Sequence, residues 1–373
     1  MIKRFLEKNI ISRLFKGKAI IILGARQVGK TTLINSIIKK KKGTILFNGD
    51  ESDIREIFKN PTSTKLKTLI GDKELVVIDE AQNIENIGLA LKLLIDNYPK
   101  IQIIATGSSA FELSNSLNEP LTGRKYEYEL FPLSFGEMSN FTSVLEEKRL
   151  LEHRLIYGYY PEIVTKSNYA KELLMQLTNS YLYRDILNFS NIKKHAKLHK
   201  LVQALALQIG NEVSFNELAN LVGLNQETVE NYIDILEKSF VIFRLTSLSR
   251  NIRNELKKSN KFYFYDNGVR NAVIKYFNNL TIRADVGALW ENFIIIERMK
   301  RNQHIGKFVN SYFWRTTSQQ EIDYIEEDNG VIYAYEFKWN KNKKAKGLNR
   351  FLKGYPNSKF EIISPENFEE FIL

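Results

Sequence analysis

Residues 20–32 (IIILGARQVGKTT) have the residue types and spacing of a phosphate-binding loop. An apolar run meets Gly24, and Gly29-Lys30-Thr31 follows, which is the pattern G-x-x-x-x-G-K-T between a strand and a helix. In such a loop, backbone N–H groups close around phosphate oxygens, the lysine reaches the β- and γ-phosphates, and the threonine hydroxyl binds Mg²⁺. We therefore expect ATP and Mg²⁺ as cofactors, with Lys30 as a catalytic residue and Thr31 as a metal ligand.

Two further polar groups follow predicted strands in the same region. Residues 74–79 (ELVVID) predict a buried strand that ends in Asp79-Glu80. This order predicts Asp79 as a Mg²⁺ ligand and Glu80 as the catalytic group that polarises the attacking water. The alternative for these two acids is a capped strand end without chemistry. Thr106 or Ser108, after a strand predicted at 101–105, is a candidate sensor of the γ-phosphate, and a plain loop rich in turn residues is the alternative. The predicted nucleotide-binding residues are Gly24, Ala25, Arg26, Gln27, Val28, Gly29, Lys30, Thr31, Thr32 and Ser108.

The C-terminal third carries a second group of residues with the types needed for hydrolysis. Glu291 lies in an apolar helical pattern, Asp323 follows a predicted strand, and Glu336 and Lys338 share one face of another strand, because strand side chains repeat every two residues. This array resembles the core of PD-(D/E)xK nucleases, whose acids bind Mg²⁺ and whose lysine activates water. The resemblance implies a second Mg²⁺ or Mn²⁺ on Glu291, Asp323 and Glu336. Lys338 would then be catalytic; the alternative is a hairpin with an ordinary cross-strand Asp–Lys pair.

Composition limits the class of protein and its partners. The chain has 373 residues, which predicts two or three domains, and it has no cysteine, which excludes disulfides and cysteine–zinc sites and fits the cytoplasm. No apolar run approaches the ~20 residues of a membrane span, so we expect no membrane insertion. The 54 basic and 43 acidic residues leave a net charge of +11, which permits a nucleic-acid partner.

Several longer stretches resemble one family. GARQVGKTT, LVVIDEAQ, IATGSSAFEL, LTGRKYEYELFPLSFGEM and GYYPEIV are similar to AAA+ ATP-binding proteins of bacteria and archaea that carry an uncharacterised C-terminal region. In AAA+ proteins an arginine just before the fifth core strand often completes a neighbouring subunit's site. Arg124 has this position, which implies a catalytic role in trans and a homo-oligomer; a surface arginine, or one that acts within its own subunit, is the alternative. Tyr159 stands where the family usually has a second glycine before a proline, which argues against a nucleotide contact there.

The order of elements and this resemblance predict an α/β protein with additional domains. Predicted helices at 214–219 and 226–237 around a glycine turn, followed by two strands, match a winged helix. Its basic wing and the basic residues 340–353 favour contact with DNA phosphates, whereas acids on the second helix would repel them. The alternatives are a winged helix used for protein contacts or packing between domains, and a solvated helix face at 340–353. The wing consists of Arg250, Arg253, Lys257, Lys258 and Lys261. The predicted domains are an AAA+-like P-loop ATPase core with a parallel sheet (1–141), a helical lid (142–190), a winged helix (191–265) and a nuclease-like α/β domain (266–373).

Three functions fit these features. The first is a nucleotide-driven switch or motor that hydrolyses ATP and acts on DNA. The second is an ATP-regulated, metal-dependent DNA nuclease. The third is a nucleotide-controlled switch for a protein partner, in which the winged helix and the nuclease-like fold serve as docking modules.

Overall fold

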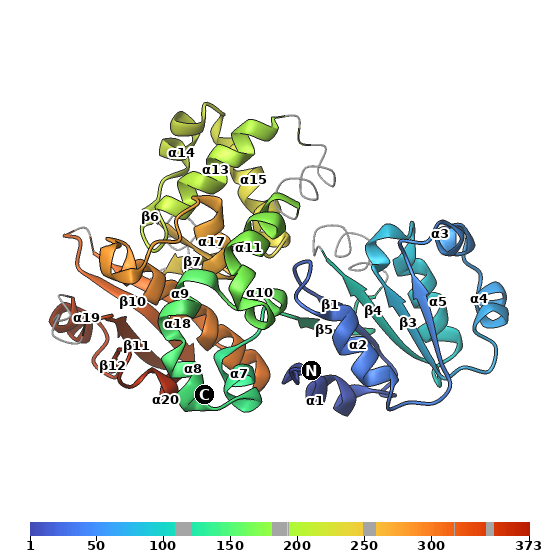
Figure 1. The fold of residues 1–373 in the computed structure, drawn as a ribbon. Coiled ribbons are helices and arrows are strands. Elements are labelled where there is room, and N and C mark those ends of the chain that lie inside the picture. The colour runs from blue at the N-terminus through green and yellow to red at the C-terminus, as the bar shows by residue number, and fades with distance from the viewer. Residues whose placement is uncertain (109–120, 181–191, 193, 249–258, 317, 341–346) are drawn as a thin grey trace. The chain divides into compact units, whose positions relative to one another are not determined.

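The structure is a computed structural model, and it describes residues 1–108, 121–180, 192, 194–248, 259–316, 318–340 and 347–373 (Figure 1). The chain forms two compact units. The first unit comprises Met1–Pro132 and the short segment Lys238–Phe240, and the second comprises Leu133–Glu237 and Val241–Leu373. In the part of the chain that the structure describes, no helix is long and apolar enough to cross a membrane.

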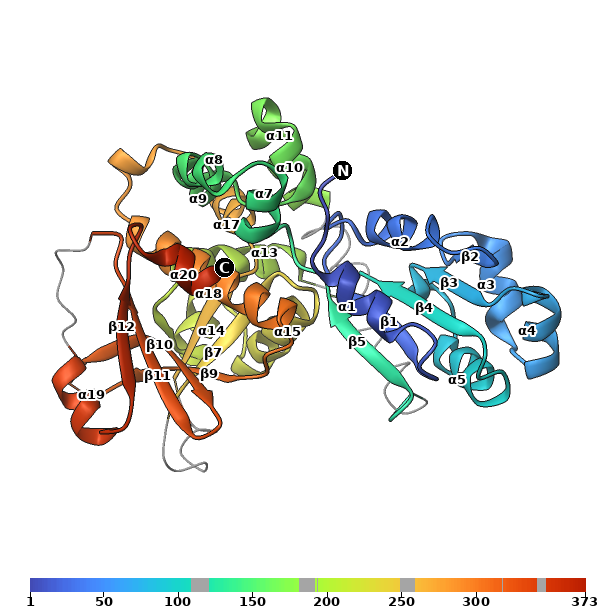
Figure 2. The same cartoon turned by 90° about the horizontal axis from the view of Figure 1, so that it is seen from below.

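A five-stranded sheet of order β2-β3-β4-β1-β5 forms the centre of the first unit (Figure 2). All neighbouring strands run parallel, as predicted, so their carboxyl ends meet at one edge of the sheet. Strands β1, β3 and β4 are buried along their whole length, which explains their apolar sequences. The strands are β1 (Ala19–Leu23), β2 (Thr44–Asn48), β3 (Leu75–Asp79), β4 (Gln102–Gly107) and β5 (Lys125–Glu129), and the helices are α1 (Leu6–Arg13), α2 (Lys30–Ile38), α3 (Ser52–Lys59), α4 (Ser63–Ile70) and α5 (Ile87–Asn97).

The second unit begins with a run of short helices. The described part of the segment predicted as a lid, residues 142–180, consists of short helices and belongs to this unit and not to the first, whereas residues 181–190 lie outside the described residues. The helices of this run are α7 (Phe135–Phe141), α8 (Val144–Arg149), α9 (Leu151–Tyr157), α10 (Pro161–Thr165) and α11 (Ala170–Thr178).

The helix pair predicted for a winged helix follows. It consists of α14 (Phe215–Val222) and α15 (Gln226–Lys238), after α13 (His195–Leu207). Gly223 ends α14 with a φ of 70°, a conformation that favours glycine, and strands β7 (Ile242–Ser247) and β8 (Asn260–Phe264) come next.

The predicted basic wing is only partly within the described residues. Arg250, Arg253, Lys257 and Lys258 lie outside them, and so do residues 341–346 of the C-terminal basic stretch. The assignment of Lys261 to the wing is wrong, because Lys261 lies in β8 and its side chain is buried. Both faces of β8 are buried from Lys261 to Phe264, so this side chain lies inside the unit, which a count of basic residues could not reveal.

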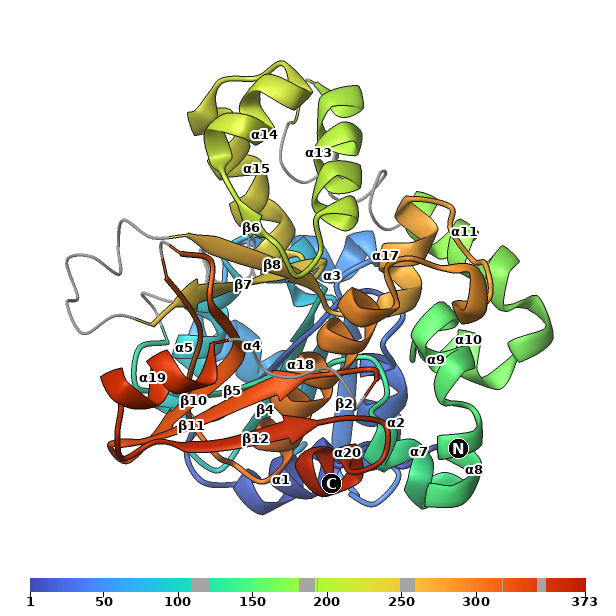
Figure 3. The same ribbon diagram turned by 90° about the vertical axis from the view of Figure 1, so that its left-hand side faces the viewer.

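The strands of the predicted winged helix and of the C-terminal domain form one sheet (Figure 3). Its seven strands have the order β12-β11-β10-β9-β7-β8-β6, and β7 pairs in parallel with β9, so the predicted boundary at 265/266 runs through a continuous sheet. The remaining elements are β6 (Glu212–Val213), α17 (Asn267–Val273), α18 (Val286–His304), β9 (Asn310–Arg315), β10 (Glu321–Asp328), β11 (Val331–Phe337), α19 (Leu348–Gly354), β12 (Lys359–Ile363) and α20 (Phe368–Ile372).

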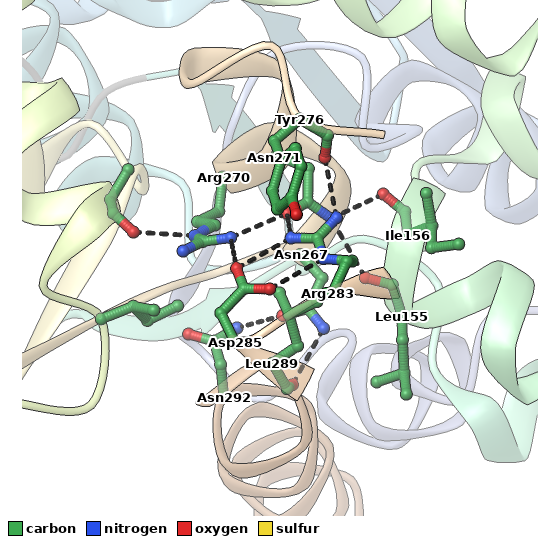
Figure 4. Close-up of polar contacts among 12 residues, drawn as sticks. Leu155, Ile156, Asn267, Arg270, Asn271, Tyr276, Arg283, Asp285, Leu289 and Asn292 are labelled. Carbon is green, nitrogen blue, oxygen red and sulfur yellow. Dashed lines mark hydrogen bonds and ion pairs between the residues drawn. The ribbon is translucent and has the colours of Figure 1, made fainter. Parts of the chain in front are cut away.

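A buried polar network joins the helices of the second unit (Figure 4). Arg270 of α17 donates to Asp285 (2.5 Å) and to the carbonyl of Ala206 in α13 (2.8 Å). Asn271 donates to the carbonyl of Ile156 in α9 (2.8 Å), and Arg283 donates to Asp285 (2.8 Å). Because buried polar groups are costly unless they are paired, this network fixes the helices at 151–157 and 195–207 to the C-terminal part of the unit.

Candidate functional site

The loop from Gly24 to Lys30 follows β1 and leads directly into α2. A Cβ at Gly24 would overlap the carbonyl oxygen of Leu130, so the chain can pass here only as glycine. Gly29 caps α2 with a φ of 97°, a left-handed conformation that disfavours other residues. Both glycines of the motif are therefore required by the backbone, and the loop lies at the carboxyl edge of the parallel sheet.

The side chain of Lys30 turns back onto the loop that precedes it. Its ammonium group donates to the carbonyls of Gly24 (2.9 Å) and Ala25 (3.0 Å), and the residue is only 5% exposed. Burial lowers the pKa of Lys30 to about 8, although the nearby carboxylates of Glu80 and Asp79 act in the opposite direction. The ammonium is thus held where phosphate oxygens could replace two backbone carbonyls as its acceptors.

Thr31 and Asp79 are brought together at the same edge. The Thr31 hydroxyl donates to Asp79 Oδ2 at 2.8 Å, and Thr106 of β4 donates to Asp79 Oδ1. Asp79 ends β3 and is 7% exposed. A hydroxyl beside a carboxylate is an oxygen donor set that suits Mg²⁺, so the residues present fit this ion.

Glu80 has an unusual backbone conformation directly after β3. Its φ is 49° and its ψ is 43°, which is left-handed for a residue other than glycine, and such conformations cluster at functional sites. The Glu80 N–H donates to Thr106 Oγ1 (3.2 Å), and its carboxylate accepts from Gln82 Nε2 (2.6 Å). Ser108, which follows β4, also contacts Gln82, so the predicted sensor and the predicted water-activating acid share one neighbour.

Sequence reasoning missed two residues of this site, Gln82 and Arg4. Arg4 precedes α1, is 7% exposed, and donates to the carbonyls of Val28 in the phosphate-binding loop (2.7 Å) and of Phe131 (2.6 Å). An arginine inside the apolar pattern of the first helix was the available signal for Arg4. For Gln82 the signal was an amide side chain two residues after Glu80.

Arg124 lies at the opposite edge of the first sheet. It precedes Lys125, which pairs with Ala19 at the start of β1, whereas the phosphate-binding loop follows Leu23 at the end of β1. Four steps along a strand span about 13 Å. Arg124 forms an ion pair with Asp96 (2.7 Å) and is partly exposed. This placement excludes contact between Arg124 and the phosphate-binding loop of its own chain.

The predicted C-terminal residues meet in an acidic cluster, which consists of Glu291, Glu321, Asp323 and Glu336 together with Lys261 and Lys338. Lys338 Nζ lies 2.6 Å from Glu336 Oε1 and 3.7 Å from Asp323 Oδ2. Asp323 Oδ2 also accepts from the N–H of Phe337 (2.8 Å). Three members of the predicted array, Asp323, Glu336 and Lys338, are therefore adjacent.

Glu291, the fourth member, is paired with the buried Lys261. Lys261 Nζ lies 3.3 Å from Glu291 Oε1 and also contacts Glu321, and Tyr263 donates to Glu291 at 2.5 Å. Burial alone would lower the pKa of Lys261, but Glu291 and Glu321 raise it above its ordinary value. Burial raises the pKa of Glu291 and of Glu336 to about 7. Among the residues described, no group of three or more His, Cys, Asp or Glu side chains could hold a metal ion, so the second metal site predicted here has no support in the structure.

Comparison with known proteins supports the assignment of the first unit. The model of an AAA domain matches residues 16–139, and two models of domains of unknown function, DUF8612 and DUF4143, match residues 148–280 and 286–367. A Walker-type ATPase of Pyrococcus abyssi is similar in structure, with a TM-score of 0.51 at 15% identity, over 74% of this chain and 96% of that one. These likenesses support an AAA-like P-loop ATPase fold, and they lend no support to a nuclease-like C-terminal domain.

Two curated relatives extend over most of the chain. An uncharacterized protein of Methanocaldococcus jannaschii is 25% identical over 399 residues, which cover 98% of this chain and 87% of that protein. An uncharacterized protein of Mycobacterium tuberculosis is 26% identical over 329 residues, which cover 87% of this chain and 71% of that protein. The similarity therefore spans both units and not the ATPase core alone.

Proposed function

We propose that this protein binds ATP with Mg²⁺ in the first unit and hydrolyses it. The observation that carries this proposal is the convergence of the loop lysine, the Thr31–Asp79 pair and Glu80 at the carboxyl edge of one parallel sheet. An AAA-like P-loop fold over this region supports the same reaction.

The side chains divide the reaction among them. Lys30 would exchange its two carbonyl acceptors for oxygens of the β- and γ-phosphates, while Thr31 and Asp79 would hold Mg²⁺, Asp79 through water. The bound ion supplies neutralisation of the charge that develops on the phosphates. Glu80 would accept a proton or hydrogen bond from the attacking water, and Ser108 would contact the γ-phosphate.

We further propose that hydrolysis drives a switch or motor that acts on DNA. The net charge of +11 and the exposed Lys200 on α13 favour contact with phosphates. The exposed acids Glu227 and Glu230 on α15 oppose entry of that helix into a groove. Contact would therefore run along basic surfaces and not through α15, whose acidic face is instead suited to a protein partner.

The test compares ATP hydrolysis by the wild type and by Glu80→Gln, with and without duplex or single-stranded DNA, at low and moderate salt. Glu80→Gln should bind ATP with unchanged affinity and lose about 10²-fold or more in kcat, because only the water-activating group is altered. Stimulation by DNA that weakens with salt supports the DNA switch. Hydrolysis indifferent to DNA favours a nucleotide-controlled protein switch, and a wild type without hydrolysis contradicts the proposal.

An ATP-regulated nuclease is the second candidate, because Asp323, Glu336 and Lys338 are adjacent in the acidic cluster. The ammonium of Lys261 between Glu291 and Glu321 argues against it. Running the same DNA reactions on a gel with Mg²⁺ or Mn²⁺ decides the matter. Cleavage that disappears in Asp323→Ala would establish the nuclease, whereas intact DNA would reject it.

A further inference from the structure

The side chain of Gln82 bridges two residues of the nucleotide site. Gln82 lies in the 3₁₀ turn η1 (Ala81–Asn83), directly after Glu80. Its Nε2 donates to Glu80 Oε2 at 2.6 Å and to Ser108 Oγ at 3.0 Å, and its Oε1 accepts from the N–H of Ser108 at 3.3 Å. The atom beside Glu80 must be the nitrogen, because an ionised carboxylate only accepts hydrogen bonds. One amide group therefore links the end of β3 to the end of β4.

The groups around this bridge are fixed by other contacts. The main chain of Glu80 is held by donation of its N–H to Asp79 Oδ1 (3.2 Å) and Thr106 Oγ1 (3.2 Å). Ser108 is 3% exposed. Gln82 then determines where the Glu80 carboxylate points, because it is the side chain that contacts Oε2 at a distance typical of a strong, charge-assisted hydrogen bond.

The direction of the hydrogen bonds leaves both partners able to act on a reaction. Ser108 Oγ accepts from Gln82, so the hydroxyl hydrogen can be donated to an oxygen of a γ-phosphate. Glu80 is held through Oε2, so Oε1 can accept from a water molecule. A phosphate at Ser108 and a water at Glu80 would thus be connected through a single amide.

We propose that Gln82 is a positioning residue that couples Ser108, at the γ-phosphate end of the site, to the carboxylate of Glu80. This inference rests on the proposed ATP hydrolysis and adds a residue to it. Gln82 orients Glu80 toward the attacking water when Ser108 engages the γ-phosphate. It does not contact the reacting atoms itself.

The test is a double-mutant cycle between Gln82 and Ser108, with kcat and KM for ATP measured for Gln82→Ala, Ser108→Ala and the double variant. Each single variant should lower kcat by about 10- to 100-fold, the scale of a misplaced catalytic group, with KM changed less than about threefold. The double variant should be no slower than the slower single variant, because both changes break one chain of contacts.

Asn83 offers a matched control on the same turn. Its amide donates to Asp50 (2.7 Å) away from Glu80, so Asn83→Ala should keep the kcat of the wild type. Gln82→Glu tests the hydrogen-bond direction, because it keeps the shape and places a second carboxylate beside Glu80; it should be at least as slow as Gln82→Ala. Unfolding midpoints close to that of the wild type exclude a loss of folding as the cause.

The outcomes separate this inference from the function on which it rests. A wild type that hydrolyses ATP while Gln82→Ala matches Asn83→Ala would overturn the coupling and leave the ATPase intact. Losses in kcat that multiply in the double variant, or a loss that appears in KM alone, would also overturn it. A wild type that binds but does not hydrolyse ATP would reject the proposed function and the coupling together.

Discussion

At the scale of single residues, two adjacent carboxylates differ in their surroundings because of one change in the backbone. Asp79 ends β3 and faces the hydroxyls of Thr31 and Thr106. Glu80 has a left-handed conformation, and its carboxylate contacts Gln82 instead. The two acids are therefore separated into one group suited to a metal ion and one suited to water, as the proposed hydrolysis requires.

Arg4 is predicted to hold the phosphate-binding loop in shape. Its guanidinium donates to the carbonyls of Val28 and Phe131, and the loss of hydrogen bonds between buried groups costs roughly 1–3 kcal/mol. Arg4→Ala should weaken ATP binding by about tenfold or more, an effect of roughly 1.4 kcal/mol. Arg4→Lys should restore only part of it, because an ammonium lacks the planar fork.

Titration calorimetry with ATP measures this effect. Arg13→Ala is the control, since Arg13 is an exposed arginine at the end of the same helix, α1. An ATP Kd for Arg4→Ala equal to that for Arg13→Ala would show that the loop keeps its shape without the guanidinium.

At the scale of elements, the local sequence pattern was sufficient to predict some parts of the fold but not the pairing of distant strands. The phosphate-binding loop and the acids after β3 could be predicted, because strand, loop and helix are contiguous in the sequence. The pairing of β7 with β9 could not, because it joins distant segments through backbone bonds that leave no mark on residue type. Lys261 shows the same limit. The basic residues that precede it in the sequence suggested a surface wing, but Lys261 lies in β8 and is a buried cation of the acidic cluster.

Lys261 is therefore predicted to stabilise the second unit. Removing one partner of a buried ion pair leaves an uncompensated charge and typically costs about 3–5 kcal/mol. Lys261→Met should lower the unfolding midpoint of this unit, and Lys261→Met/Glu291→Gln should recover part of the loss, since it removes one of the two carboxylates that Lys261 contacts.

Urea unfolding followed by tryptophan fluorescence reports on this unit, because Trp290, Trp314 and Trp339 all lie in it. For the wild type, Mn²⁺ or EDTA should leave the midpoint unchanged, since the ammonium groups of Lys261 and Lys338 already contact the four carboxylates of the acidic cluster. A midpoint that rises with Mn²⁺ and loses this dependence in Asp323→Ala would contradict the prediction and favour a metal site.

At the scale of the whole molecule, the proposed chemistry and its proposed output lie in different units. The first unit holds all the residues proposed for ATP, and the second holds the helix pair α14–α15 and the acidic cluster. The similarity to relatives extends over both units, so these relatives share the second unit as well as the ATPase core. The output of the proposed hydrolysis would then depend on the second unit or on assembly of several chains.

Substitution of Arg124 tests whether ATP hydrolysis requires the assembly of several chains. It lies at the amino edge of the first sheet, distant from the loop of its own chain, so any contact with a γ-phosphate must be made in another subunit. Arg124→Ala should keep ATP affinity and, if the arginine acts in trans, lower kcat by about 10³- to 10⁵-fold.

A mixing experiment tests the action in trans directly. Lys30→Ala should be inactive for a different reason, since its own phosphate-binding loop is damaged while its Arg124 is intact. Mixing the two inactive variants should restore hydrolysis, because some interfaces then combine an intact loop with an intact arginine. Asp96→Ala, which removes the ion-pair partner of Arg124, serves as the control and should remain active. A mixture as inactive as its components, or an Arg124→Ala variant with full kcat, would show that each chain hydrolyses ATP without an arginine from its neighbour.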